Sequence, residues 1–174
     1  MQGIKAPDPT AEQQFCDLVS TYQTALLRMC YFCLQDRALA EDAVQETFIK
    51  VWKSYDQFRD ECNVKTWIMR IAINTCHDMQ RSWWSKHISR HVTLDMLALT
   101  KETEGISDEA IRLNNEIASL PLKLREVILL YYYHNMQVNE IAVALEIAPS
   151  SVSGRLKRAK DKLRAALKGA YFDE

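Results

Sequence analysis

The chain has 174 residues, a formal net charge of −1 and 48% hydrophobic residues, which allows a packed core and argues against intrinsic disorder. Four glycines and four prolines are too few for a turn-rich β fold, and no apolar run is long enough to span a membrane. The N-terminal segment lacks the apolar core of a signal peptide, so we expect the chain to stay in the cytoplasm.

Apolar side chains recur at helical spacing through the first half of the chain. They predict three amphipathic helices, over residues 13–35, 38–55 and 64–84. The polar segment 58–63 interrupts this pattern and reads as a loop, with Asn63 as the expected N-cap of the third helix.

Two of the five cysteines, Cys30 and Cys33, form a C-x-x-C pair inside the apolar stripe of the first helix. Two small buried residues on one helix face are the preferred interpretation. A zinc site would need Cys62, Cys76 or His77 to fold back onto this pair, and nothing in the sequence requires it. The odd number of cysteines also argues against a disulfide framework.

The second helix carries a polar face opposite its apolar stripe, formed by Asp42, Gln45, Glu46 and Ile49. Paired carboxylates suit acid–base chemistry, but no nucleophile accompanies them. A surface that docks another protein is the better interpretation, and a merely solvated face remains the alternative.

The third helix carries a polar and largely basic stripe beside Trp67, with Trp83 and Trp84 at its end. Cations that pair with phosphates, next to aromatic rings that stack on bases, are typical of single-stranded DNA binding. Trp67 is expected in the core, whereas the two terminal tryptophans could stack on bases or close the core. The stripe consists of Lys65, Arg70, Asn74, His77 and Arg81.

Residues 85–106 lose the helical period, and residues 91–115 hold 5 acidic and 2 basic side chains, which predicts an acidic linker. Ser107 is the expected cap of a new helix. Pro121 fits the first turn of the next helix, 121–134, whose apolar stripe includes Tyr131 and, less firmly, Tyr132.

The C-terminal part of the chain has the pattern of a helix-turn-helix. A short helix near 138–145 and a long one near 150–168 are separated by Ile147, which is expected to fill the space between them. The long helix turns serines and basic residues away from its apolar side, as a helix that enters the major groove does. An ordinary helical hairpin with a solvated basic face is the alternative. The sequence thus predicts an all-α fold of two small helical domains joined by a linker.

These segments together resemble a known family. Residues 42–52 are similar to the polymerase-binding segment of region two of bacterial sigma factors, and residues 58–59 with 65–74 are similar to its promoter-melting segment. Residues 120–127 and 140–159 are similar to region four and its helix-turn-helix. The chain therefore resembles an extracytoplasmic-function (ECF) sigma factor of the sigma-70 family.

The resemblance implies a region-two domain at 10–90, an acidic linker at 91–106 and a region-four domain at 107–174. It implies binding to the clamp region of the largest subunit of core RNA polymerase through Asp42, Gln45, Glu46, Phe48, Ile49 and Trp52. It implies contacts with the minus-ten element through Arg59, Asn63, Lys65, Arg70, Asn74, His77 and Arg81. It implies contacts with the minus-thirty-five element through Ser150, Ser151, Ser153, Arg155, Arg158 and Lys162.

An anti-sigma factor is a further expected partner, and the resemblance implies no catalytic residue, cofactor, metal or membrane insertion. Glu146, where such turns often have glycine, and Gly154, within the reading helix, depart from the family pattern. The competing interpretation is a helix-turn-helix regulator that binds operators alone, with residues 1–90 as a dimerisation or sensing domain. An enzyme is disfavoured because no nucleophile–base set or phosphate-binding loop is present. Because the net charge is near zero, we expect the free chain to bind promoter DNA poorly.

Overall fold

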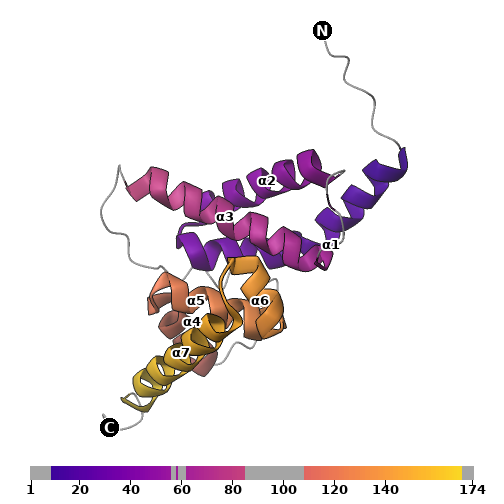
Figure 1. Ribbon diagram of the computed structural model, residues 1–174. Helices are drawn as coiled ribbons and strands as arrows, with labels where there is room; N and C mark the ends of the chain where they lie inside the picture. The colour runs from indigo at the N-terminus through magenta and orange to yellow at the C-terminus, as the bar shows by residue number, and fades with distance from the viewer. Residues whose placement is uncertain (1–8, 56–57, 59–61, 85–107, 170–174) are drawn as a thin grey trace.

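The computed structural model describes residues 9–55, 58, 62–84 and 108–169, and these residues form helices without any β-strand. The helices α1 (Pro9–Leu34), α2 (Arg37–Ser54) and α3 (Val64–Trp84) pack on one another as a three-helix unit. Figure 1 shows this unit above a second group of shorter helices that ends in the long helix α7. The all-helical prediction is therefore confirmed for the described residues.

The second group contains α4 (Asp108–Ser119), α5 (Leu122–Ile128), the π-helical turn η3 (Leu129–Tyr133), α6 (Val138–Leu145) and α7 (Pro149–Gly169). Helix α7 packs across α4, α5 and α6. We call α1–α3 the N-terminal half and α4–α7 the C-terminal half. The expected cap Ser107 and the expected linker 91–106 lie outside the described residues.

One aspartate and one asparagine cap the first turns of helices α2 and α3. The Asp36 carboxylate accepts a hydrogen bond from the Leu39 amide at 3.0 Å at the start of α2. Asn63 accepts from the Thr66 amide at 2.7 Å at the start of α3, so the predicted cap is confirmed. Helix α1 begins at Pro9, four residues before the predicted start, because its first turns precede the apolar stripe.

The core of the N-terminal half contains the three buried cysteines, Cys30, Cys33 and Cys76, all of them free thiols. The hydrogen bond with Cys76 and burial together raise the pKa of Cys33 well above its ordinary value, which keeps this thiol neutral. The interpretation of the C-x-x-C pair as buried core residues is confirmed. Trp67 is also buried, with its ring 4.7 Å from the ring of Phe58.

The helix predicted over 121–134 differs from the observed one in two respects. Pro121 is the N-cap of α5 rather than a residue of its first turn. After Ile128 the chain widens into the π turn η3, in which the His134 amide donates to the Leu129 carbonyl at 3.1 Å. The extra residue per turn keeps Leu129 and Leu130 in the core and rotates the tyrosines outward.

The expectation that Tyr131 and Tyr132 belong to the buried stripe is therefore wrong. Their side chains are 36% and 51% exposed, and the Lys160 ammonium lies over both rings, 5.8 and 5.6 Å from the centroids.

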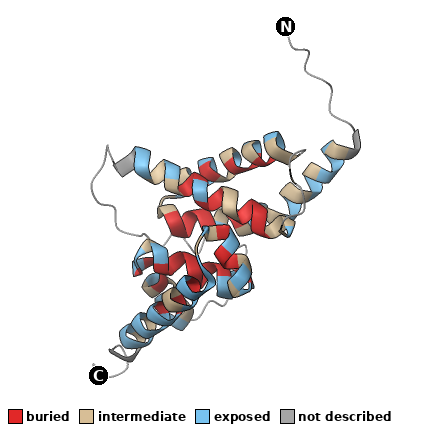
Figure 2. Ribbon diagram, in the orientation of Figure 1, coloured by how far each residue is buried: buried red, intermediate tan, exposed pale blue. Residues whose placement is uncertain are grey.

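The two halves are packed against each other, with α3 lying on α6 and α1 on α5. Buried residues continue from one half into the other in Figure 2. The buried Arg125 guanidinium reaches from α5 to the end of α1 and donates to the Phe32 carbonyl at 2.5 Å and to the Leu120 carbonyl at 2.8 Å. Gln35 donates to the Ala118 carbonyl at 2.5 Å beside it.

Candidate nucleic-acid and protein interfaces

Helix α2 presents an acidic and apolar surface that the fold leaves uncovered. Asp42 and Gln45 are exposed and Glu46 is half-buried. Ile49 is 46% exposed and Trp52 is 38% exposed, which is unusual for such large apolar side chains. We call these five residues the α2 face. Carboxylates around exposed apolar groups suit a protein partner with a basic rim.

The sixth predicted member of this surface, Phe48, lies behind it. Its side chain is only 9% exposed and its ring meets that of Phe15 edge-on, with centroids 6.2 Å apart. The centroid of the same Phe15 ring lies 4.8 Å from that of the Trp52 ring, so Phe15 packs against the tryptophan. Phe48 therefore positions the α2 face rather than forming part of it.

Lys50 joins the α2 face to α3. Its ammonium lies 3.9 Å from both the Glu46 and Asp78 carboxylates and donates to the Thr75 hydroxyl at 3.1 Å. These pairs are largely solvent-exposed, so they orient the side chains more than they stabilise the fold.

The predicted strand-binding residues of α3 divide into two groups. Arg70 is half-buried, Asn74 is exposed and Arg81 is exposed beside Asp78, with which it forms an ion pair. Within the part of the chain that the structure describes, no hydrogen bond or ion pair joins these three residues to the C-terminal half. Arg59, together with the side chains of Trp83 and Trp84, lies outside the described residues.

The second group, Asn63, Lys65 and His77, contacts the C-terminal half. The Asn63 amide donates to the Glu140 carboxylate, and the Lys65 ammonium donates to the His134 carbonyl. His77 Nε2 lies 2.5 Å from Glu126 Oε1. The structure thus brings three residues predicted to hold DNA into contact with the protein itself.

Charges at this contact shift the pKa values of both histidines. The Glu126 carboxylate, hydrogen-bonded to His77, raises the pKa of the imidazole above its ordinary value of 6.5. Burial, helped by the nearby Lys65 and Arg28 charges, lowers the pKa of His134 to about 4, so that this ring is neutral near pH 7.

The helix-turn-helix consists of α6, the turn at 146–148 and α7. Ile141, Val152 and Leu156 are buried between the helices, and Ile147 packs partly buried against the same core. Glu146 adopts the left-handed conformation, with φ 54°, and its amide donates to the Val143 carbonyl at 3.4 Å. The turn keeps the geometry that glycine normally provides, although its residue is not glycine.

The outer side of α7 carries the predicted reading residues. They project from its first four turns, on the side away from the buried Val152. Exposed members are Ser150, Ser151, Ser153, Arg158 and Lys162, and Arg155 is half-buried. The Arg158 Nε donates to the Gly154 carbonyl at 3.2 Å, which leaves the rest of the guanidinium for a ligand.

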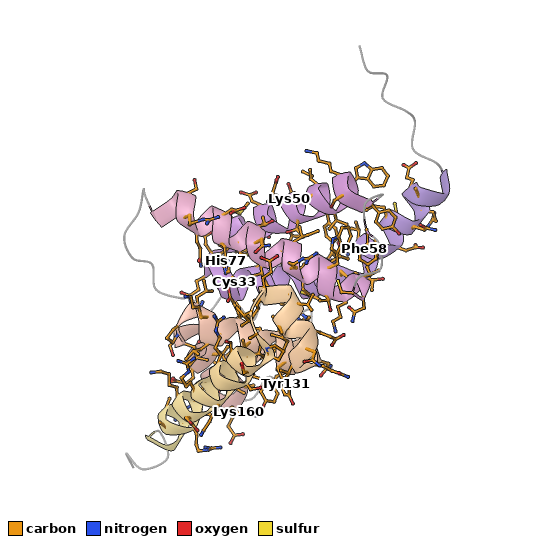
Figure 3. All side chains as sticks on the ribbon, in the orientation of Figure 1. Cys33, Lys50, Phe58, His77, Tyr131 and Lys160 are labelled. Carbon is orange, nitrogen blue, oxygen red and sulfur yellow. The ribbon has the colours of Figure 1, made fainter. Side chains whose placement is uncertain are left out.

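An apolar groove of about 630 Å³ in the C-terminal half is a feature that sequence reasoning missed. It lies between α4, η3 and α7, and Leu113, Ile117 and Leu163 line it, with Lys160 and Arg164 also at its wall. Figure 3 shows Tyr131 and Lys160 together beside α7. The signal available in the sequence was the apolar stripe of α7, which continues beyond the helix-turn-helix core.

The described residues hold no group of three metal-ligating side chains placed to bind an ion. In the same part of the chain, none of the helices is both long and apolar enough to cross a membrane.

Each half of the chain is similar to a known protein family. The family model of sigma-70 region 2 matches residues 18–86, and that of sigma-70 region 4 matches residues 110–163. The ECF RNA polymerase sigma factor SigW of Bacillus subtilis is 28% identical over 177 residues, which cover 95% of each chain.

Two solved structures resemble the whole chain. CnrH, solved in complex with the cytosolic domain of CnrY, is 26% identical with a TM-score of 0.68, covering 91% of this chain and 90% of that one. RpoE of Bartonella quintana, solved with the anti-sigma factor NepR, has a TM-score of 0.74 at 21% identity, covering 93% of this chain and 99% of that one, and shows the fold alone.

Proposed function

The chain belongs to the sigma-70 family, in its extracytoplasmic-function group, and we propose which of its surfaces perform each step of transcription initiation. It is an RNA polymerase sigma factor, which binds core polymerase and directs it to promoters. Sigma factors are regulatory initiation factors, and we propose that this chain catalyses no reaction of its own and acts in the cytoplasm.

The α2 face is the proposed docking surface for core polymerase, at the clamp region of its largest subunit. The observation that carries this proposal is the pair of exposed apolar side chains, Ile49 and Trp52, beside the carboxylates of Asp42 and Glu46. Large aromatic residues at the centre of an interface and charges at its rim are the usual division between affinity and partner choice.

Helix α3 is the proposed binding site for the non-template strand at the minus-ten element. Arg70, Asn74 and Arg81 are placed to pair with phosphates and bases along one helix, and Asn63 and Lys65 extend the row toward the loop that precedes α3. Contacts of this kind hold single strands through their backbone and stacked bases.

Helix α7 is the proposed reader of the minus-thirty-five element. Its serines and Arg158 are exposed on the side away from the helix-turn-helix core, and Arg155 is half-buried; this arrangement presents side chains to the major groove. The boundaries 10–90, 91–106 and 107–174 remain the proposed division of the chain into two DNA-contacting domains and a linker.

An anti-sigma factor is a further partner that we infer for this chain. Support comes from the similar RpoE structure, which was solved with one. The groove between α4 and α7 is apolar and has Lys160 and Arg164 at its wall, so it fits an amphipathic helix that carries acidic residues.

A regulator that binds operators alone leaves the α2 face without a role, and the two matched regions occur in sigma factors in this order.

The test of the proposed function is transcription from fragmented genomic DNA by purified core polymerase, with start sites mapped by sequencing. We expect discrete start sites only when this chain is added. Asn74→Ala, at an exposed position away from the contact between the halves, is expected to reduce open complexes at those sites.

A matched exposed change on another helix, Gln13→Ala, is the control and should leave open complexes unchanged. Identical start sites with and without the chain would contradict the proposed function.

A further inference from the structure

The C-terminal half lies on the part of α3 that is proposed to hold the promoter strand. Lys65 donates to the His134 carbonyl, Asn63 donates to Glu140, and His77 pairs with Glu126. Each contact uses a hydrogen-bonding group that a DNA strand on α3 would also need. The C-terminal half therefore competes with DNA for this part of α3.

The His77–Glu126 pair differs from the other two contacts because its buried partner is a carboxylate. The Glu126 side chain is only 2% exposed, whereas the His77 side chain is 38% exposed. A buried carboxylate needs a cation or several hydrogen bonds to offset its lost hydration. Protonated His77 supplies a cation at 2.5 Å, and it does so only while the halves are packed together. In Figure 3, His77 is labelled on the side of α3 that faces the C-terminal half.

The other charged or titratable groups around this pair come from three helices. Asp78 and Arg81 lie beside His77 on α3, and Arg125 lies beside Glu126 on α5. The thiols of Cys33 on α1 and Cys76 on α3 face the Glu126 carboxylate. Asp78 and Arg81 oppose each other in their effect on His77, and the thiols are neutral, so Glu126 dominates the environment of the imidazole.

We propose that the free chain is autoinhibited, with the His77–Glu126 pair acting as a proton-dependent latch that holds the C-terminal half over the strand-binding surface of α3. This inference rests on the proposed function of α3. The latch must open before the promoter strand can occupy Asn63, Lys65 and His77.

The direction of the pH effect follows from the closed state. Because Glu126 raises the pKa of His77 when the halves are packed, the latch contributes fully below the ordinary histidine value of 6.5. Its contribution is lost as the pH rises through the raised pKa, where His77 becomes neutral and the buried carboxylate loses the cation that is hydrogen-bonded to it. The open state therefore gains population from slightly acidic to mildly alkaline pH.

The first measurement is small-angle X-ray scattering of the full chain at about pH 6 and about pH 8.5. A compact chain of 174 residues has a radius of gyration of about 16 Å, and separated halves on a linker exceed it clearly. The test variant is Glu126→Gln, which keeps the shape and an acceptor but removes the charge. The matched control is Asp161→Asn, which removes one exposed carboxylate from α7.

We expect the wild type and Asp161→Asn to expand as the pH rises, and Glu126→Gln to be expanded at both pH values. His77→Gln, which keeps a hydrogen-bonding group but cannot titrate in this range, is the second variant and should also lose the pH dependence. If circular dichroism shows that Glu126→Gln does not fold, the scattering of His77→Gln alone tests the latch. A wild-type radius that is the same at both pH values would overturn the latch.

A binding measurement separates the latch from the proposed function. The probe is a fluorescent pool of random single-stranded 20-nucleotide DNA at about pH 6, and we expect Glu126→Gln to bind it about 3- to 10-fold more tightly than the wild type. Asp161→Asn controls for the lost negative charge. Expansion of Glu126→Gln without tighter binding would confirm the latch and contradict strand binding by α3. Unchanged scattering together with normal promoter opening by the holoenzyme would refute the latch alone.

Discussion

Two residues of the helix-turn-helix have backbone conformations or propensities that lower the stability of the fold. Glu146 holds a left-handed conformation that costs a residue with a side chain roughly 1–2 kcal/mol, and Gly154 lies inside α7, where it lacks the helix propensity of alanine. Residues that weaken local structure are often retained where a surface must meet a ligand. Gly154 lies between Ser153 and Arg155, two of the proposed reading residues.

Replacing Gly154 with alanine should therefore stabilise the protein. A Cβ built at this position meets no atom within 4 Å, so the added methyl group causes no clash. The expected gain in the free energy of unfolding is about 1 kcal/mol, or roughly 2–4 °C in the melting temperature. Thermal unfolding followed by circular dichroism measures it, with Ala166→Gly at an exposed position of the same helix as the reverse control. A lower melting temperature for Gly154→Ala would show that α7 needs the glycine backbone.

At the scale of elements, the two sides of α2 have separate roles: the inner side packs in the core and the outer side is proposed to bind a partner. Its inner side packs Ala43, Thr47 and Val51 into the core, so its folding does not depend on the outer carboxylates. A charge change on the α2 face should thus affect association and leave the fold intact.

Reversing Glu46 to lysine should weaken binding to core polymerase because it would place a cation against the basic surface that the α2 face is proposed to meet. We expect about a tenfold or greater loss of affinity, equivalent to roughly 1.4 kcal/mol, measured by fluorescence anisotropy with purified core. Glu116→Lys makes the same reversal on α4 and serves as the control. Full affinity of a folded Glu46→Lys protein would remove the α2 face from the polymerase interface.

Helix α7 permits a similar test of promoter reading. Replacing Arg155 or Arg158 with alanine should cost about 1–3 kcal/mol if the side chain reads a base, with relaxed preference at one upstream position. A side chain that contacts only phosphate should instead weaken binding evenly across sequences. Arg164→Ala, farther along α7 and paired with Asp161 at 3.3 Å, is the matched control. Dependent promoters that are transcribed normally by the double variant would exclude α7 as the reader.

The sequence predicts most of these elements because they follow local rules. The caps, the apolar period and the helix-turn-helix spacing each depend on residues within a few turns, as Asn63 and Ile147 illustrate. The π turn could not be predicted, because an apolar period alone does not reveal the one extra residue that rotates Tyr131 and Tyr132 outward. The groove beside these tyrosines was missed for the same reason.

The contact between the halves was also beyond sequence reasoning, since it joins residues that are 49–77 positions apart in the chain. His77 and Lys65 looked like ligands for DNA because both are polar residues on one side of α3. Nothing in the sequence indicates that Glu126 is buried and hydrogen-bonded to the His77 imidazole, or that the backbone carbonyl of His134 meets Lys65.

At the scale of the whole molecule, the two halves each offer a small number of DNA contacts, and the net charge of −1 adds little attraction. Core polymerase can change this by holding the halves at a fixed separation. The second contact with DNA then becomes intramolecular, and the affinity rises steeply without any new interaction. The latch proposed above would add to this effect, because docking of the α2 face would favour the open arrangement.

The most direct test of this account is equilibrium binding of a fluorescent promoter fragment, taken from a mapped start site, at moderate salt. The fragment is titrated with this chain alone, with core polymerase alone and with both. The account predicts selective binding only in the mixture, with permanganate-reactive thymines near the start site that report strand opening. Tight and sequence-selective binding by the chain alone, without core polymerase, would contradict it and indicate a stand-alone regulator.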